Sequence, residues 1–232
     1  MKNSYSPIIE SYVKRIINKL KDNLEMIYII GSSATEDVVA NWSDIDAIIV
    51  LKEYVFEDIE IIKKVSNSYE IKIGNTLYSK REFENKNIDS KTYYYLYLYN
   101  NNVLDITYLS KDLIIPKITF EECLLATKIV LLNDLHNLKR LLTYDFLSNQ
   151  QLKLMYKKLY VIMKSILIIN KKFPKNYEET FKMFSKEFNF EYFDYLKFID
   201  DFRNDNVSRD YMIKYSYDFI IYITNMIVDK KI

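Results

Sequence analysis

The sequence predicts an α+β fold, in which a mixed β-sheet with flanking helices is followed by an all-α helical bundle. Two observations predict this order. Short continuous apolar runs of strand length, ended by turn residues, lie in residues 1–116. After Pro116, apolar residues recur every three to four positions, which is the period of an amphipathic helix. We therefore expect two domains, residues 1–116 and residues 117–232.

The first domain is expected to begin with a helix that leads into two buried strands. Ser6 and Pro7 are typical of a helix start, and apolar residues then recur on one face as far as Leu20. The apolar runs of residues 26–30 and 45–51 have the length and continuity of strands that are buried on both faces.

In the rest of the first domain, the sequence predicts one more helix, one more strand and a hairpin. Residues 57–66 suit a short helix, and residues 70–79 suit a third strand. The tyrosine-rich run 92–99 and the apolar run 103–109 flank three asparagines that tolerate turns, so the pair predicts a β-hairpin. The tyrosines of that first strand would share one face. Packing against a helix is their expected role, and stacking on a base or a substrate ring is the alternative.

The second domain is expected to contain helices throughout. Leucines at helical spacing follow Pro116, residues 152–167 repeat the pattern, and residues 211–226 predict a final helix. Two capping-box patterns mark helix starts, and they consist of Thr119 with Glu122 and Asn176 with Glu179.

Composition excludes several classes of protein. The single cysteine and the single histidine exclude a disulfide framework and a zinc site rich in Cys or His. No apolar run reaches the roughly 18 residues that would span a bilayer, and the N-terminus lacks the apolar core of a signal peptide, so we expect a cytoplasmic protein. Residues 1–116 carry 14 Lys and Arg against 17 Asp and Glu, and the whole chain has a net charge of +1. Neither DNA nor a membrane is therefore an expected partner.

Three acidic residues lie in apolar stretches where strands are expected. Residues two apart in a strand share a face, so Asp44 and Asp46 point the same way. Two adjacent carboxylates repel each other unless a cation lies beside them, and Mg²⁺ accepts one or two carboxylates together with waters and phosphates. Asp105 is a third acid, within residues 103–109. If its strand lies beside the other, the three could hold two metal ions roughly 3.5–4 Å apart for in-line displacement at phosphorus.

A glycine ends the strand that precedes this acidic pair. Gly31 permits a tight turn, and the backbone N–H groups that follow it, at Ser32 and Ser33, can face phosphate oxygens. Ser43 is expected to orient Asp44 by a hydrogen bond, because no histidine is near to activate it as a nucleophile. We therefore expect phosphates to bind between the turn and the carboxylates.

These residues together resemble the DNA polymerase beta-like nucleotidyltransferase superfamily. Its signature is an apolar strand, Gly-Ser or Gly-Gly, a spacer of about a dozen residues, Asp-x-Asp or Asp-x-Glu, and an acid on a later strand. The matching positions are Gly31, Ser32, the spacer 33–43, Asp44, Asp46 and Asp105. Residues 41–51 particularly resemble the minimal and the aminoglycoside- or lincosamide-modifying members, which place a helical bundle after the catalytic sheet, and the helical half of this chain matches them in kind. The run Thr-Glu-Asp at residues 35–37 stands where many relatives have Arg-Gly.

The resemblance implies an enzyme that binds a nucleoside triphosphate with two Mg²⁺ ions; ATP is the expected co-substrate, while the nucleotide preference is open. It implies that the enzyme transfers the nucleoside monophosphate to a hydroxyl group and releases pyrophosphate, with residues 1–116 as the catalytic domain. The residues assigned to catalysis and metal binding are Asp44, Asp46 and Asp105, and those assigned to the nucleotide are Gly31, Ser32, Ser33 and Ser43.

The acceptor is expected to be a small molecule, such as an aminoglycoside or lincosamide antibiotic. Overall size and layout favour this acceptor, and the acidic first half would attract a cationic substrate. A protein or a tRNA modified within a toxin–antitoxin module is one alternative, and a protein that binds nucleotide without turnover is another. The general base is open between Asp105 and a glutamate such as Glu121, Glu122 or Glu178. The aromatic-rich helices suit a homodimer and intramolecular packing equally.

Overall fold

The computed structural model describes residues 4–34, 38 and 42–229 and confirms the α+β fold. The chain divides into two compact units, Met1–Cys123 and Leu124–Ile232, so residues 117–123 lie with the sheet. The first unit contains α1 Ser6–Leu20, η1 Lys21–Asn23, β1 Leu24–Ile30, η2 Gly31–Ala34, β2 Ile45–Leu51, α2 Phe56–Ser66, β3 Ile73–Ser79, α3 Lys80–Glu84, α4 Ser90–Asn100 and β4 Tyr108–Leu109. Helix α5 Phe120–Leu141 crosses the division, and the second unit continues with α6 Asn149–Ile169, α7 Tyr177–Phe188, α8 Tyr195–Arg203 and α9 Arg209–Val228.

The first unit is built on a mixed sheet with the strand order β3-β2-β1-β4. Strand β1 runs antiparallel to β2 and β4, and β2 runs parallel to β3, with α2 as the connection between them. Every residue of β1 is buried, as expected for a strand with apolar side chains on both faces. The expected strands at 26–30, 45–51 and 70–79 are confirmed.

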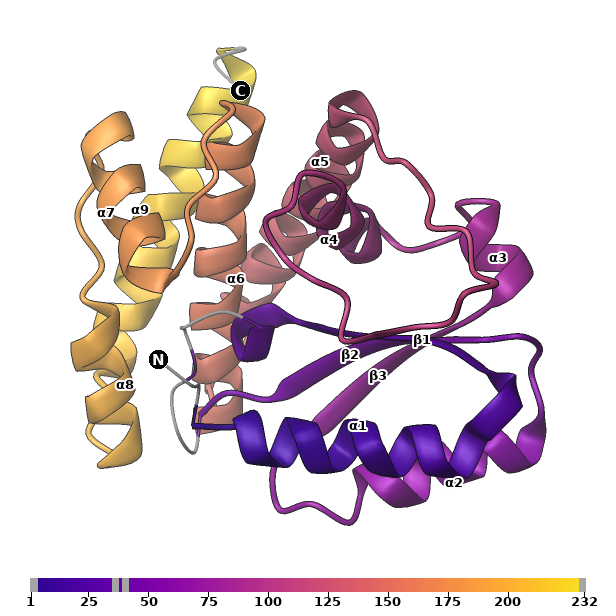
Figure 1. Ribbon diagram of the computed structural model, residues 1–232. Coiled ribbons are helices and arrows are strands. Elements are labelled where there is room, and N and C mark those ends of the chain that lie inside the picture. Colours follow the sequence, from indigo (N-terminus) through magenta and orange to yellow (C-terminus); the bar gives the residue numbers. More distant parts are fainter. Residues whose placement is uncertain (1–3, 35–37, 39–41, 230–232) are drawn as a thin grey trace. The chain divides into compact units, whose positions relative to one another are not determined.

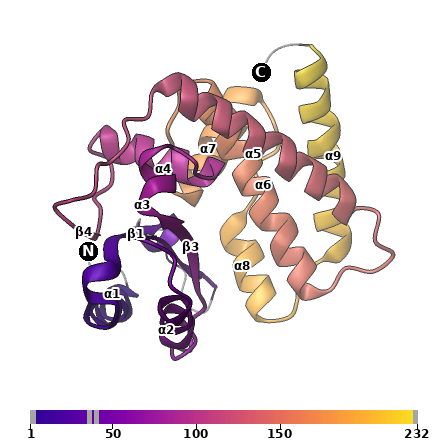
Figure 2. The same cartoon turned by 90° about the vertical axis from the view of Figure 1, so that its right-hand side faces the viewer.

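Helices cover both faces of this sheet (Figure 1). Helices α1 and α2 lie side by side on one face, where Ile27 and Ile29 join their core (Figure 2). Helix α4 lies on the other face, where Tyr28 and Ile30 join a second core with Ile48 of β2. Alternate residues of one strand therefore belong to different cores, which follows from the two-residue period of a strand.

The expected hairpin is wrong in its first strand, because residues 92–99 belong to helix α4. Asp89 caps the helix, accepting a hydrogen bond from the backbone N–H of Thr92 at 2.7 Å. Tyr95 and Leu96 are buried among the side chains of the sheet. Alternating tyrosines favour a strand locally, but β propensity depends on context, and here the cap and the packing of an apolar helix override it.

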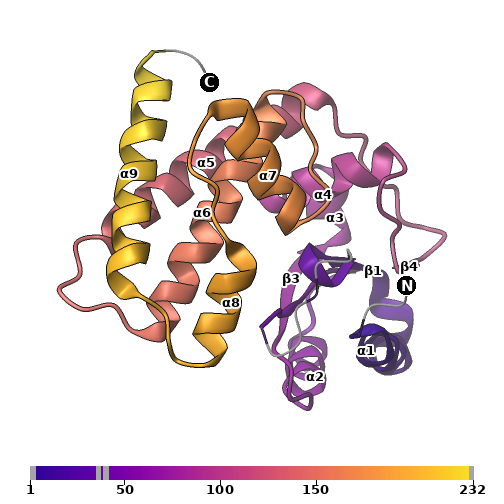
Figure 3. The same cartoon turned by 90° about the vertical axis from the view of Figure 1, so that its left-hand side faces the viewer.

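The second unit is helical throughout its described part, and α6 contacts both α7 and α9 (Figure 3). Many aromatic side chains pack in its core, where the ring of Tyr156 stacks on that of Phe198 at 5.1 Å. The half-buried Lys158 ammonium pairs with Asp134 at 2.5 Å and joins α6 to α5. No helix in residues 4–34 or 42–229 is both long enough and apolar enough to cross a membrane.

One capping box is confirmed, and the other forms only in part. At the start of α5, Thr119 N–H donates to Glu122 at 2.8 Å and Glu122 N–H donates to the Thr119 hydroxyl at 3.2 Å. At α7, Asn176 accepts a hydrogen bond from the N–H of Glu179, whose carboxylate accepts from Lys175 N–H instead of from the cap residue.

Candidate active site

The carboxylate of Asp46 lies beside both glycines of the chain. Asp46 pairs with Ile30 of β1 on one side and with Gly74 of β3 on the other. A Cβ atom at Gly31 would stand 3.0 Å from Asp46 Oδ2, and a Cβ atom at Gly74 would stand 3.3 Å from Oδ1. Real Cβ atoms rarely approach so closely, so any side chain at these positions would crowd the carboxylate. The two glycines thus permit the close approach of the backbone to the two oxygens of Asp46.

The turn at Gly31 is confirmed. Gly31 has a φ of +75°, in the left-handed region that L side chains rarely adopt, and it begins the short 3₁₀ turn η2 instead of an α-helix. The Ser33 hydroxyl donates to the Ile30 carbonyl at 2.9 Å, and the Gly31 N–H donates to the hydroxyl of Tyr95 at 3.0 Å. Ser32 is half-buried and Ser33 is buried. The Thr-Glu-Asp run at 35–37 lies outside the described residues.

Asp44 lies immediately before β2, where hydrogen bonds fix the chain on both sides. The carbonyl of Ser43 accepts a hydrogen bond from the Tyr5 hydroxyl at 3.2 Å, and the N–H of Ile45 donates to the Lys72 carbonyl at 3.0 Å. Ser43 is buried and Asp44 is half-buried. Asp44 therefore lies on a well-held segment two residues from Asp46, while the orienting role of Ser43 stays a prediction.

Asp105 lies in an irregular segment, so its expected place within a strand is wrong. Strand β4 contains only Tyr108 and Leu109, and the hydroxyl of Thr107 accepts the hydrogen bond from Ile29 N–H at 3.3 Å. A side chain thus replaces the backbone carbonyl in the ladder, which ends the pairing before residue 105 is reached.

Asp105 nevertheless affects the pKa of Tyr28, which lies on the face of the sheet that carries Asp46. Burial raises the pKa of Tyr28, and the nearby Tyr95 and Asp105 raise it further. Tyr28 lies two residues before Ile30, the pairing partner of Asp46, so Tyr28 and Asp46 are on the same face. The Asp105 side chain itself is exposed.

The carboxylates of Asp44 and Asp46 suit a Mg²⁺ ion whose remaining ligands are waters and phosphates. Among the described residues, no group of three His, Cys, Asp or Glu side chains is placed to hold a metal ion. Asp105 as a third ligand therefore stays a prediction. Mg²⁺ commonly binds one or two carboxylates and completes its shell with waters and phosphates. The half-exposed carboxylate of Asp46 fits this mode, and it already accepts a cation, because Lys91 Nζ lies 3.0 Å from its Oδ2.

Three residues of this site were missed as site residues by the sequence analysis. Gly74 lies in an expected strand, and its one signal was the rarity of glycine in this chain, which has two. Lys91 and Tyr95 come from α4, whose first residues the sequence analysis placed before and within a strand. In the helix these two residues lie about one turn apart on one face, so that Lys91 contacts Asp46 and Tyr95 contacts Gly31.

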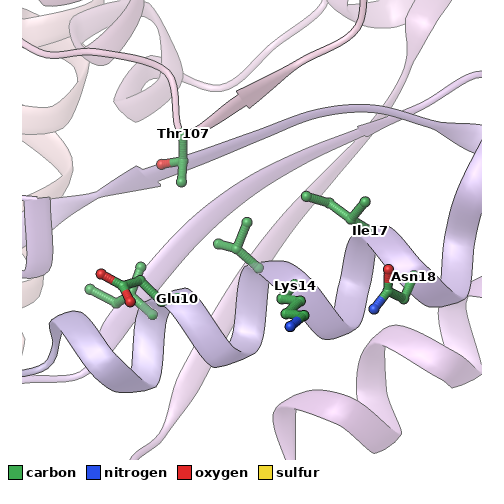
Figure 4. A pocket seen from close by; sticks show the side chains of 7 residues that line it. Glu10, Lys14, Ile17, Asn18 and Thr107 are labelled. Carbon is green, nitrogen blue, oxygen red and sulfur yellow. The ribbon is translucent and has the colours of Figure 1, made fainter.

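A separate hollow of about 290 Å³ lies beside α1 (Figure 4). Glu10 and Lys14 line it from the helix, and Thr107 lines it from the segment before β4. Helix α1 covers the face of the sheet opposite to the one that carries Asp46, so this hollow is not part of the acidic site.

Comparison with known proteins gives a family and a distant structural likeness. The family model described as "Nucleotidyltransferase domain" matches residues 12–135. No curated protein matches the sequence. Among solved structures, the chain is similar to the spectinomycin adenyltransferase AAD(9) from Enterococcus faecialis, crystallised with ATP and spectinomycin. The TM-score is 0.41 and the identity 17%, over 93% of this chain and 100% of that chain, which is too distant to indicate a substrate.

Proposed function

Because the chain belongs to the nucleotidyltransferase domain family, we propose that it transfers a nucleoside monophosphate from ATP, with Mg²⁺, to a hydroxyl group of a small molecule. The family model covers more than half of the chain and includes the sheet, the Gly31 turn and all three acidic residues. The chain is therefore a nucleotidyltransferase. The nucleotide, the metal and the acceptor belong to the proposal.

One observation carries the proposal: the Asp46 carboxylate lies in contact range of the Gly31 turn. The distance of 3.0 Å from Asp46 Oδ2 to a Cβ at Gly31 means that the carboxylate lies directly against the turn. A turn that presents backbone N–H groups favours phosphate, and a carboxylate favours a cation. A nucleoside triphosphate bound with Mg²⁺ carries both of these groups together.

The chain's residues have distinct roles in the proposed reaction. The acceptor oxygen forms a bond to the α-phosphorus, and the bond from that phosphorus to the bridging oxygen breaks, so that its electron pair leaves with pyrophosphate. Asp44 and Asp46 would hold Mg²⁺, which when bound neutralises charge on the phosphates. The N–H groups of Ser32 and Ser33 are assigned to phosphate oxygens.

The proton of the acceptor hydroxyl is assigned to Asp105. Of the three glutamates, Glu122 pairs with Lys86 at 2.6 Å and Glu178 pairs with Lys182, and Glu121 is the alternative to Asp105. Asp105 is exposed, and it contributes, after burial and Tyr95, to the raised pKa of Tyr28, which lies on the same face as Asp46. Counting Mn²⁺ ions bound with a nonreactive ATP analogue tests this assignment. Two Mn²⁺ ions per chain would indicate that Asp105 binds the second ion. One ion per chain would support Asp105 as the general base that accepts the proton.

The acceptor is proposed to be a cationic small molecule, such as an aminoglycoside, with a lincosamide as the second class. Residues 1–116 contain 17 acidic and 14 basic residues, so this part of the chain is negatively charged. A negative field attracts a cationic acceptor. This support concerns charge alone and does not select one antibiotic.

The test is pyrophosphate release with each of the four nucleoside triphosphates, Mg²⁺ and a panel of aminoglycosides and lincosamides. We expect release with ATP and one acceptor class, and a loss of about 100-fold or more in Asp44→Asn and Asp46→Asn with the fold retained by circular dichroism. Asp22→Asn is the matched control, because it removes an exposed carboxylate just before β1. If labelled ATP transfers its label to a co-incubated protein or tRNA, that macromolecule is the acceptor instead of a small molecule. Nucleotide binding without pyrophosphate release would contradict catalysis.

A further inference from the structure

Two side chains of α4 reach the two halves of the proposed site. Lys91 and Tyr95 are four residues apart in a helix, so they share one face. The Lys91 ammonium lies 3.0 Å from Asp46 Oδ2, and the Tyr95 hydroxyl accepts the N–H of Gly31 at 3.0 Å. The same helix therefore places a cation on the carboxylate and a hydrogen-bond acceptor on the turn.

The oxygen that Lys91 contacts is also the one nearest to the Gly31 turn. A Cβ at Gly31 would meet Asp46 Oδ2 at 3.0 Å, and Lys91 Nζ lies at the same distance from that atom. The ammonium thus contacts the carboxylate oxygen that the turn approaches, which is where the proposed function requires a metal ion. The Tyr95 oxygen stands on an N–H group of the turn, as a phosphate oxygen would.

The Lys91–Asp46 pair is too exposed to be explained as a stabilising contact. The side chains of Lys91 and Asp46 retain 47% and 41% of their exposure. Exposed pairs of this kind add little to folding because solvent screens them and both side chains lose freedom. They also exchange easily, because water replaces each partner at little cost.

A dication and an ammonium cannot share Asp46 Oδ2 without repulsion. When Mg²⁺ binds this oxygen, Lys91 must leave it, and its flexible four-carbon chain allows a move of a few ångströms. The nearest strong anionic groups would then be the phosphates that arrive with the metal, and lysine binds phosphate as a point charge.

We propose that Lys91 is the exchangeable cation of this site. Before nucleotide binds, it neutralises Asp46; it then yields that place to the metal ion and binds the phosphates of the nucleotide. This inference rests on the proposed function, because it assumes that a metal and a nucleotide bind at Asp46. It goes beyond that function by assigning to α4 a residue that acts in both states.

The first experiment measures Mn²⁺ binding without nucleotide, by calorimetry and by electron paramagnetic resonance of free Mn²⁺. Lys91→Gln removes the competing cation, so we expect Mn²⁺ to bind about three- to fivefold more tightly than in the wild type. Lys91→Arg keeps the charge and should stay near the wild-type value. Lys63→Gln is the matched control, because Lys63 forms a comparable exposed pair with Glu60 at 3.2 Å on α2.

The second experiment measures the affinity for ATP with Ca²⁺, a metal chosen to permit binding without rapid transfer. Loss of a lysine that binds phosphate should weaken ATP by about tenfold in Lys91→Gln, with most of the affinity restored in Lys91→Arg. Opposite changes in one variant, tighter for the metal alone and weaker for the nucleotide, are specific to an exchanging cation. A lysine that served only the fold would move neither affinity in a folded variant.

The results separate failure of this inference from failure of the proposed function. If the wild type binds Mn²⁺ and ATP in an Asp46-dependent manner but Lys91→Gln matches the wild type in either affinity, the exchange is overturned. If the wild type binds neither, or if Asp46→Asn changes nothing, the proposed function itself is overturned and the exchange falls with it. Should Lys91→Gln fail to fold, Lys91→Met is measured in its place with the same two expectations.

Discussion

Replacing Gly31 by alanine tests whether the turn and Asp46 depend on the absence of a side chain. Two costs arise at this position. An L residue held at a φ of +75° loses about 1–2 kcal/mol relative to glycine. The new Cβ would also stand 3.0 Å from Asp46 Oδ2, so the carboxylate must move away from the turn.

Gly74→Ala provides the matched comparison. Its Cβ would stand 3.3 Å from the other oxygen, Asp46 Oδ1, yet among the described glycines only Gly31 has a positive φ. Alanine in a compatible conformation restricts the unfolded chain and gains about 0.4–1 kcal/mol, which offsets the mild crowding. We therefore expect Gly74→Ala to remain within about 1 kcal/mol of the wild type.

The assay is unfolding in urea, followed by the fluorescence of the single tryptophan, Trp42. Trp42 is buried in the first unit, two residues from Asp44, so its emission reports the unit that carries the mutation. We expect the positive φ alone to cost Gly31→Ala about 1–2 kcal/mol of stability, or about 2–8 °C in melting temperature for a chain of this size, and the crowding of Asp46 adds to this loss. A Gly31→Ala protein as stable as Gly74→Ala would refute the assignment of strain to the turn.

Two further predictions concern side chains around the site and the sheet. Tyr95→Phe removes the oxygen that accepts Gly31 N–H at 3.0 Å, so we expect a loss of about 1 kcal/mol in Trp42-detected unfolding, and no loss would contradict the contact. The backbone N–H of Ser79, helped by the Tyr54 hydroxyl, holds the pKa of Glu82 below its ordinary value of 4.5. Because the folded pKa is lowered, Glu82 stabilises the fold above pH 4.5 and loses this effect as the pH falls through the folded pKa. The destabilisation caused by Glu82→Gln should therefore shrink as the pH falls below about 4.5, and a constant difference between the two proteins would contradict the shift.

The strands around Asp46 could be predicted because local and global preferences agree there. Apart from Asp46, residues 45–51 are apolar and mostly β-branched, polar residues bound them, and the structure has a strand at Ile45–Leu51. The two-residue period then places Asp46 on the face of Ile48. Spacing thus predicted a carboxylate on one face of a strand, and its place next to the Gly31 turn follows from the pairing of β1 with β2.

The segment from residue 89 to residue 107 could not be predicted in the same way. Its alternating tyrosines satisfy a strand, and its leucines and tyrosines also satisfy a helix that is apolar on several sides. The capping hydrogen bond of Asp89 and the core of the sheet decide for the helix, and both depend on the folded chain. Because residues 92–99 were expected to form a strand, Lys91 was not recognised as a site residue. Asp105 was likewise expected within the second strand of the hairpin, whereas the observed strand β4 contains only Tyr108 and Leu109.

The central claim is that Asp46 links nucleotide binding to a divalent cation. Isothermal titration calorimetry of ATP, with and without Mg²⁺, tests it directly in the wild type and in Asp46→Asn. We predict that Mg²⁺ tightens ATP binding by about tenfold or more in the wild type and has little effect in the variant. Equal ATP affinity with and without Mg²⁺ in the wild type, or an undiminished Mg²⁺ effect in Asp46→Asn, would contradict the claim.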